Sequence, residues 1–330
     1  MRVKIRFGKK MQRAWLVKAV VMVVAWLQVP LVRSLEIGFY ATRCPAAERI
    51  VSRLVHLASR HDPTLPAALL RLHYHDCFVG GCDASVLLDS APGYPPPEKM
   101  ALSNRSLRGF NMVDMIKRVL EAVCPGTVSC ADILALSARD AVVLAGGPSW
   151  KVPTGRRDGR LSSAVLARIS IPRPQFSAVQ LKKNFLWHGM STAEMIVLSG
   201  AHTIGSAHCV SFWDRLYHHN FTNGTDPSMA SYHAEQLKKI CPISSYKSKQ
   251  RVPLDPITPF KFDNMYYKNL NMGLGLLASD QVIHDKLTSV LSSNSTLWER
   301  SFCKAMVHLG NLNVKTGSRG EIRRNCRRRN

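Results

Sequence analysis

The sequence predicts a mostly α-helical protein that folds as one unit with few short strands. Helix start and stop signals recur along the chain, whereas the alternating pattern of a half-buried strand is scarce. Only 150–155 and 275–281 are candidates for short strands. The chain contains no internal repeat and no long linker, and the three prolines at 95–97 indicate a stiff loop instead of a domain boundary.

The first helices follow prolines. Pro45 suits the first position of a helix that runs on through 48–60, because a helix leaves the first backbone N–H unbonded and proline has none. Asp62 and Pro63 are the residue types expected for the cap and the first residue of the next helix. We therefore expect two consecutive helices in this part of the chain.

Further helix signals follow. The stretch 109–123 is amphipathic and stops at a Cys-Pro pair, and 130–148 is a mostly apolar helix ended by two glycines and a proline. Two serines fit capping boxes, in which a serine and a Glu or Gln three residues later bond reciprocally: Ser177 with Gln180, and Ser191 with Glu194. More helices are expected over 214–219, 234–240, 263–270 and 297–310.

Residues 1–34 have the composition of a secretory signal. Basic residues through Lys18 precede an apolar run over 19–32, which a glutamine and a proline interrupt. The run is too short and too broken for a membrane span, so we expect cleavage near Ser34 and one domain over 35–330. An uncleaved signal anchor is the alternative, because the basic region is unusually long.

The chain is strongly basic, with 45 Lys and Arg against 22 Asp and Glu and a net charge of +23. The predicted signal carries eight basic and no acidic residues, so its removal leaves about +15. This charge favours an acidic polysaccharide or another polyanion as a partner, and a solvated basic surface without a specific partner is the alternative. Nucleic acid is not expected, because the sequence has no helix-turn-helix, zinc-finger or RNP pattern.

All nine cysteines follow the predicted signal. In a secreted protein they are expected to form disulfides, and the absence of CxxC pairs argues against a zinc site. Their spacing leaves the connectivity open, and their odd number leaves one thiol unpaired.

The densest set of chemical groups lies in 71–85. Arg71 and His75 are four residues apart, so they share one face of any helix that contains them. A neutral imidazole can take a proton from peroxide, while a fixed guanidinium stabilises the charge that develops. Such a pair alone is more often a surface pair. Here the same stretch adds two close cysteines and three oxygen ligands suited to Ca²⁺: Cys77, Cys82, Asp76, Asp83 and Ser85.

A second histidine lies far along the chain. His202, in LSGAHTIG at 198–205, is expected near the C-terminus of the helix that Ser191 opens. Alone it would more often be a packed core histidine than a metal ligand. The order of the sites changes this interpretation, because an isolated Asp280 and a group of oxygen ligands also lie in this part of the chain: Asp255, Thr258 and Asp263.

Together these motifs resemble those of plant secretory haem peroxidases of class III. The resemblance covers nearly all of the mature chain and rests on 71–85, 128–140, 146–158, 198–205 and 262–267. It implies a two-lobed helical fold with haem b between a distal and a proximal lobe, and two bound Ca²⁺ ions. The implied reaction is 2 phenolic donor + H₂O₂ → 2 phenolic radical + 2 H₂O.

The resemblance implies a role for each site residue. His202 would be the axial ligand of the haem iron and Asp280 its hydrogen-bond partner. On the opposite side His75 would be the proton acceptor, Arg71 the transition-state stabiliser, and Asn104 would orient His75. Three more residues are implied: Glu98 supporting the distal hydrogen-bond chain, Tyr74 against the haem, and Pro172, whose carbonyl would accept the hydroxyl of the donor.

The resemblance also implies two Ca²⁺ sites made only of oxygen ligands. The distal site would use Asp76, Val79, Gly81, Asp83 and Ser85. The proximal site would use Thr203, Asp255, Thr258, Lys261 and Asp263. Because Asp76 follows His75 and Thr203 follows His202, loss of Ca²⁺ should loosen the pocket. The alternative is that these residues are ordinary caps.

Four disulfides follow from the resemblance: Cys44–Cys124, Cys77–Cys82, Cys130–Cys326 and Cys209–Cys241. Cys303 has no partner in the family, and we expect it to be a buried free thiol. The chain departs from the family at Tyr74, where phenylalanine is usual. The hydroxyl of this tyrosine could hydrogen-bond to peroxide or be oxidised.

The resemblance implies a monomer exported to the cell wall or extracellular space, without a stable membrane anchor. The sequons at Asn220, Asn223 and Asn294 are candidates for glycosylation, whereas Asn104 should be buried and unmodified. Two other functions stay open: a non-enzymatic wall protein that binds pectin-like polyanions, and a fungal-type manganese or lignin-attacking peroxidase. The latter needs a carboxylate cluster near a haem propionate or an exposed radical tryptophan, neither of which the sequence assigns.

Overall fold

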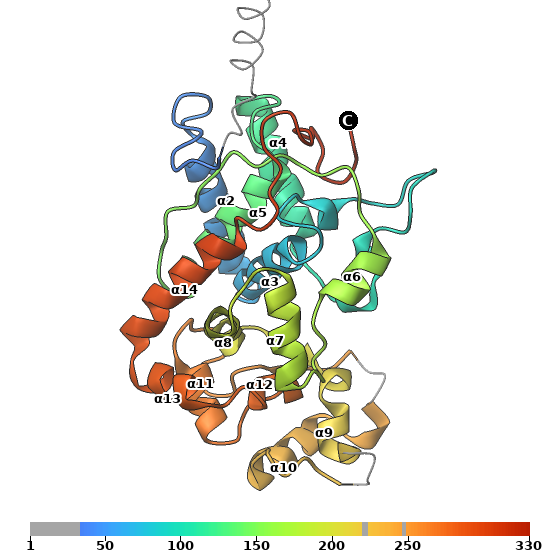
Figure 1. Ribbon diagram of the computed structural model, residues 1–330, viewed down its shortest axis with the longest axis vertical. Coiled ribbons are helices and arrows are strands. Elements are labelled where there is room, and N and C mark those ends of the chain that lie inside the picture. Colours follow the sequence, from blue (N-terminus) through green and yellow to red (C-terminus); the bar gives the residue numbers. More distant parts are fainter. Residues whose placement is uncertain (1–33, 220–223, 246–248) are drawn as a thin grey trace, which may run out of the picture. The chain divides into compact units, whose positions relative to one another are not determined.

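Helices dominate the computed structural model, which describes residues 34–219, 224–245 and 249–330. Residues 35–330 form one compact unit (Figure 1). The described part of the chain contains thirteen α-helices and one two-stranded sheet. Every helix in it is too short or too polar to cross a membrane. The predicted signal, apart from Ser34, and the sequons at Asn220 and Asn223 lie outside the described residues.

The first half of the unit contains α2 Ala47–His61, α3 Leu65–Cys77, α4 Phe110–Val123, α5 Cys130–Leu144, α6 Ala164–Ser170 and α7 Ala178–Trp187. The second half contains α8 Thr192–Ser199, α9 Trp213–Tyr217, α10 Ser231–Ile240, α11 Met265–Asn271, α12 Ala278–Gln281, α13 Lys286–Ser293 and α14 Ser295–Leu309. Short 3₁₀ turns include η1 Ser85–Leu87, η2 Glu98–Met100, η3 Leu102–Asn104, η4 Gly200–Thr203 and η5 Cys209–Ser211. Strands β1 Ser206–His208 and β2 Arg251–Pro253 pair antiparallel, with Ser206 opposite Pro253.

Two groups of helices build the unit. Helix α5 packs against α2, α3 and α4, and α8 packs against α7, α13 and α14. Figure 1 shows the two groups in different halves of the unit, with α14 running between them. Most residues of α5 are buried, as its apolar sequence predicts, and Trp298 of α14 stacks on the buried Phe262. This arrangement confirms the predicted mostly α-helical fold.

Several helix ends follow the predicted signals. Helix α4 begins at Phe110 and ends before Cys124, and α5 ends just before the predicted glycines. Both capping boxes are present, because the Ser177 and Ser191 side chains accept from the backbone N–H three residues later and the reciprocal bonds also form. His202 lies in η4, directly after α8, as expected.

The predicted starts of the first two helices are wrong by a few residues. Helix α2 begins at Ala47, two residues after Pro45. Helix α3 begins at Leu65 after Thr64, because Asp62 ends α2 and its carboxylate accepts from the Thr64 backbone N–H at 2.9 Å. Asp62 therefore forms the turn between the two helices instead of capping the second.

Both predicted strands are wrong. In 150–155 only Thr154 pairs, in an isolated bridge with Glu36, and 275–281 ends in α12. The observed strands, β1 and β2, have three residues each. A segment this short cannot show a strand periodicity, so register and neighbours decide its structure instead of local pattern.

The structure contains the four disulfides that the family resemblance implies: Cys44–Cys124, Cys77–Cys82, Cys130–Cys326 and Cys209–Cys241. Cys303 is free, as expected, but it is half-buried instead of fully buried. The reason is its place on α14, at the edge of the core, where its Sγ lies 3.8 Å from the Ser149 carbonyl oxygen.

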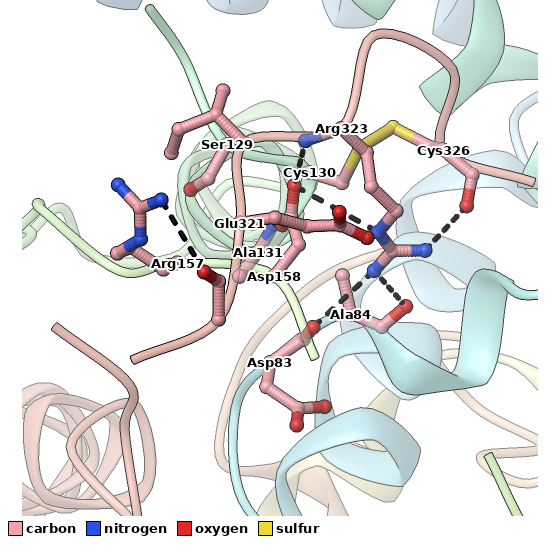
Figure 2. A network of polar contacts seen from close by, with 12 residues as sticks. Asp83, Ala84, Ser129, Cys130, Ala131, Arg157, Asp158, Glu321, Arg323 and Cys326 are labelled. Carbon is pink, nitrogen blue, oxygen red and sulfur yellow. Dashed lines mark hydrogen bonds and ion pairs between the residues drawn. A yellow bond between two sulfur atoms is a disulfide. The ribbon is translucent and has the colours of Figure 1, made fainter. Parts of the chain in front are cut away.

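A buried arginine ties the C-terminal segment to the rest of the unit (Figure 2). The Arg323 guanidinium donates to the carbonyls of Ala84 (2.7 Å) and Cys326 (2.6 Å). Its backbone N–H donates to Asp158 (2.9 Å), which also accepts from the Ala131 N–H in the first turn of α5 (2.9 Å). Together with the disulfide of Cys326, this network joins α5, the loop before η1 and the C-terminal segment.

Removing the disulfide at this junction should lower the free energy of unfolding by about 2–5 kcal/mol, because Cys130–Cys326 closes a loop of 196 residues. The double variant Cys130→Ala/Cys326→Ala tests this in urea unfolding. Cys303→Ser is the matched control, since it removes a thiol without opening a loop, and should unfold near the wild-type midpoint. An unchanged midpoint for the double variant would contradict the expectation.

Candidate active site

Helix α3 carries both members of the predicted acid–base pair, one turn apart. His75 is buried, and its Nδ1 lies 2.7 Å from Asn104 Oδ1. Asn104 Nδ2 in turn donates to the backbone carbonyl of Glu98 at 2.9 Å, which leaves Oδ1 as the atom facing the imidazole. Nδ1 of His75 therefore carries the proton and donates, while Nε2 keeps its lone pair.

Electrostatics keep His75 neutral and Arg71 charged. Burial lowers the pKa of His75 well below its usual value, and the charge of Arg71 lowers it further, while the bond to Asn104 raises it. Burial also lowers the pKa of Arg71, to about 10, which leaves the guanidinium cationic at neutral pH. Arg71 donates to Ser106 Oγ and to the Ser103 carbonyl, both at 3.0 Å. A neutral base and a fixed cation thus lie side by side.

The second histidine has a different partner. His202 Nδ1 lies 2.8 Å from Asp280 Oδ1, and the buried Asp280 also accepts from the Tyr266 hydroxyl (3.1 Å) and the Leu277 N–H (3.2 Å). Burial lowers the pKa of His202, but the charge and hydrogen bond of Asp280 outweigh burial and raise it. With Nδ1 engaged, Nε2 is the ring nitrogen available to a metal ion.

One guanidinium acts on both histidines. The charge of Arg71 lowers the pKa of His75 and also opposes protonation of His202, so both rings lie within electrostatic reach of the same cation. Protein surrounds the His202 ring closely enough for burial to affect its pKa, yet 39% of the side chain is accessible. The ring therefore lies in a recess. Gly205 brings the segment after His202 against α3, since a Cβ at this positive-φ position would lie 3.2 Å from Ala67 Cβ.

Other predicted site residues lie around this pair. Tyr74 is half-buried on α3, and burial raises its pKa. Its hydroxyl has no hydrogen-bond partner in the part of the chain that the structure describes. Pro172 lies between α6 and α7, in a segment anchored to α12 by the bond from the Ser279 N–H to the Pro174 carbonyl, 2.9 Å. His73 is buried beside Cys77, and burial lowers its pKa to about 3.

The predicted distal Ca²⁺ ligands form a buried acidic cluster. Asp76, Asp83, Ser85 and Glu98 are all buried. Burial, and then the charge of Asp83, raise the pKa of Asp76 to about 8. Burial and Asp76 likewise raise the pKa of Glu98 well above its usual value. Among the described residues, Ser85 Oγ and Glu98 Oε2 have no hydrogen-bond partner, so the cluster holds more oxygen atoms than hydrogen-bond donors.

This cluster refines the role expected of Glu98. Its backbone carbonyl, and not its carboxylate, supports Asn104, while the carboxylate faces the acidic cluster. Val79 and Gly81, whose carbonyls are predicted Ca²⁺ ligands, lie in the loop that follows α3. Gly81 has φ +112° and approaches the Asn313 carbonyl so closely that a Cβ would lie 2.6 Å from its oxygen. Only glycine fits this turn of the loop.

The predicted proximal Ca²⁺ ligands also come together. The Thr203 hydroxyl oxygen lies 3.2 Å from Asp255 Oδ2, 3.2 Å from Asp263 Oδ1 and 3.5 Å from the Lys261 carbonyl oxygen. The Thr258 hydroxyl lies 3.2 Å from the same two carboxylates. Two hydroxyl protons cannot serve all these contacts, so the oxygen atoms exceed the available donors. Such a set suits a hard cation.

The sequence did not point to three supporting residues. Tyr266 holds Asp280 through its hydroxyl, and Ser106 holds Arg71. The Lys315 ammonium pairs with Asp83 of the acidic cluster, although 232 residues separate them. No local pattern marks such contacts. Tyr266 lies in the FDNMYY motif, and this was the only available signal.

Comparison with known proteins identifies the family of the chain. The peroxidase family model matches residues 51–294. Peroxidase 72 of Arabidopsis thaliana is 46% identical over 299 residues, 88% of each chain. Peroxidase 5 of Vitis vinifera is 44% identical over 95% of this chain and 97% of its own. Peroxidase 1 of Zea mays is 43% identical over 88% of this chain and 82% of its own. The chain therefore belongs to the plant class III peroxidase family, the oxidoreductases that use hydrogen peroxide to oxidise electron donors.

Proposed function

We propose that this peroxidase binds haem b between His75 and His202 and oxidises small phenols: 2 phenolic donor + H₂O₂ → 2 phenolic radical + 2 H₂O. The observation that carries this proposal is that two imidazoles within electrostatic reach of one guanidinium have different hydrogen-bond partners. Asn104, a neutral amide, holds one ring as a free base. Asp280, a carboxylate, holds the other as a metal ligand.

The residues present fit a haem group. The engaged Nδ1 and accessible ring of His202 leave Nε2 to hold the iron, and Asp280 makes that nitrogen a stronger electron donor. When bound, haem supplies the iron that accepts the two oxidising equivalents of peroxide. Tyr74, half-buried beside Arg71, would flank it.

The chain's own groups then carry the protons and the charge. His75 Nε2 takes a proton from one peroxide oxygen and delivers it to the other, so that this oxygen leaves as water instead of hydroxide. Arg71 stabilises the negative charge on the leaving oxygen. Asn104 keeps the proton of the neutral ring on Nδ1, so that Nε2 carries the lone pair, while burial and the charge of Arg71 disfavour a second proton in the resting state. The Pro172 carbonyl would accept the hydroxyl of the phenolic donor.

Two Ca²⁺ ions would complete the acidic cluster and the proximal ligand set. The unpartnered Ser85 Oγ and the raised pKa of Asp76 support the distal site. The surplus of oxygen atoms around Thr203 supports the proximal one. Because Asp76 and Thr203 each adjoin a site histidine, bound cations would fix the two imidazoles in place.

The proposed setting is the cell wall or extracellular space. Four disulfides suit an oxidising compartment, and the predicted signal would direct export. The net charge of the mature chain supports contact with acidic wall polysaccharide, and the protein is proposed to act as a monomer. This chemistry can serve several roles: lignin or suberin formation, wall cross-linking, the oxidative stress response and peroxide removal. Exposed Asn294, whose side chain caps α14, is a proposed glycosylation site.

Absorption spectra and guaiacol turnover of purified variants test the assignment of the two histidines. His75→Leu should keep the haem absorption band but lose roughly 10²–10⁴-fold in turnover, because it removes only the general base. His202→Leu should lose the normal haem band, because it removes the iron ligand. His61→Gln, on an exposed histidine at the end of α2, is the control and should match wild type. Normal turnover of His75→Leu would contradict the proposal.

Removing Ca²⁺ should destabilise the protein more at higher pH. The pKa of Asp76 is raised to about 8 from 3.8, so the folded protein holds a proton that the unfolded chain releases. The stability that this proton contributes is fully present below about pH 4 and is lost as pH rises through 8. Ca²⁺ would offset that loss by balancing the ionised carboxylate. Melting temperatures with and without EDTA should therefore differ more near pH 8 than near pH 4. Asp76→Asn should flatten this dependence, and an EDTA effect independent of pH in wild type would exclude this role of Asp76.

A further inference from the structure

A continuous row of aromatic rings leads from the site to the surface. It begins at Tyr74, next to His75 on α3. The ring centroid of Tyr74 lies 4.4 Å from that of Phe78. The Phe78 ring stacks on His188, with centroids 4.3 Å apart and planes at 27°. His188 in turn lies 5.0 Å from Trp187, the last residue of α7. Each of these centroid separations is typical of aromatic rings in contact or slightly shorter.

The inner part of the row is held in place by packing and hydrogen bonding. Phe78 is fully buried. The ring nitrogens of His188 lie close to two carbonyl oxygens, Nδ1 2.7 Å from that of Asn184 and Nε2 2.8 Å from that of Phe78. A neutral imidazole can donate to only one of them, and that bond fixes the ring between its two neighbours in the row. Since electron transfer between rings weakens steeply with distance, a fixed row of contacting rings is a favourable route.

The outer end of the row is open. The Trp187 side chain is 65% exposed, and Val179 and Leu186 on the same helix are also exposed. Lys182 and Lys183 lie exposed between them on α7. This part of α7 therefore offers an oxidisable indole, apolar contact surface and positive charge together. Such a surface suits an aromatic polymer that carries acidic groups.

We propose that Trp187 is a second oxidation site, at which the enzyme oxidises phenolic polymers too large to enter the recess. The inference rests on the proposed peroxidase function, because the oxidising equivalents come from the reaction with H₂O₂. One electron passes from Trp187 inward along His188, Phe78 and Tyr74. A phenol of the polymer returns one electron to Trp187 and releases its proton to solvent. Two such transfers complete 2 ArOH + H₂O₂ → 2 ArO• + 2 H₂O.

The surroundings of Tyr74 and Trp187, the two ends of the row, favour oxidation at Trp187. Tyr74 follows Arg71 by three residues on α3, so a positive charge on its half-buried ring would lie beside the guanidinium and be disfavoured. At Trp187 water stabilises the charge left by a lost electron. Tyr74 and the two rings that follow it then serve as a bridge, and the oxidised state rests at the surface.

Radical trapping on the haem-loaded protein tests the site independently of turnover. The enzyme is mixed with H₂O₂ and the spin trap 2-methyl-2-nitrosopropane without a donor, then digested and analysed by mass spectrometry. The expected result is an adduct on the peptide that contains Trp187, and its loss in Trp187→Phe. Tyr232→Phe is the matched control, because Tyr232 is an exposed aromatic residue on α10 outside the row. It should keep the Trp187 adduct.

Turnover of two donors then separates this site from the recess. With dialysed lignosulfonate, Trp187→Phe should lose roughly tenfold in kcat/KM, a factor that corresponds to about 1.4 kcal/mol. With guaiacol it should match wild type, and Tyr232→Phe should match wild type with both donors. A wild type that oxidises guaiacol but forms no Trp187 adduct would overturn this inference alone. Unchanged lignosulfonate turnover in Trp187→Phe would do the same, whereas a wild type inactive with both donors would overturn the proposed function as well.

Discussion

The hydrogen bond between His202 Nδ1 and Asp280 Oδ1 is the interaction on which the site depends. It fixes which ring nitrogen of His202 is free and makes that nitrogen electron-rich. His75 has the same side chain but an amide partner, whose bond does not offset burial and the charge of Arg71, so its pKa is lowered where that of His202 is raised. In the proposed function these different surroundings make one histidine a base and the other a metal ligand.

The fold places these partners through contacts between distant segments. Asp280 comes from α12, Tyr266 from α11 and His202 from η4, and one cluster of hydrogen bonds joins them. On the distal side, Asn104 reaches His75 from η3. The buried Arg323 network and the disulfide beside it hold the loop that contains the acidic cluster. The segments that close the fold therefore lie next to those that position the imidazoles.

Local sequence predicted the helices well and the strands poorly. Helices α4 and α5 and both capping boxes follow from short-range patterns. The three-residue strands β1 and β2 depend on pairing between segments 45 residues apart, which no local pattern encodes. Arg71 and His75 could be paired from their helical spacing alone. The partnership of His202 with Asp280 needed the family resemblance, and the contacts of Tyr266 and Lys315 needed coordinates.

The reduction potential of the haem iron in Asp280→Asn tests whether Asp280 acts through the iron ligand His202. Asparagine keeps the size of the side chain and an oxygen within reach of Nδ1, but it removes the negative charge that makes His202 electron-rich. The account predicts a higher potential than in wild type, because the more oxidised iron loses the larger share of stabilisation. A potential equal to that of wild type would show that Asp280 does not act through the iron ligand, and would contradict the account.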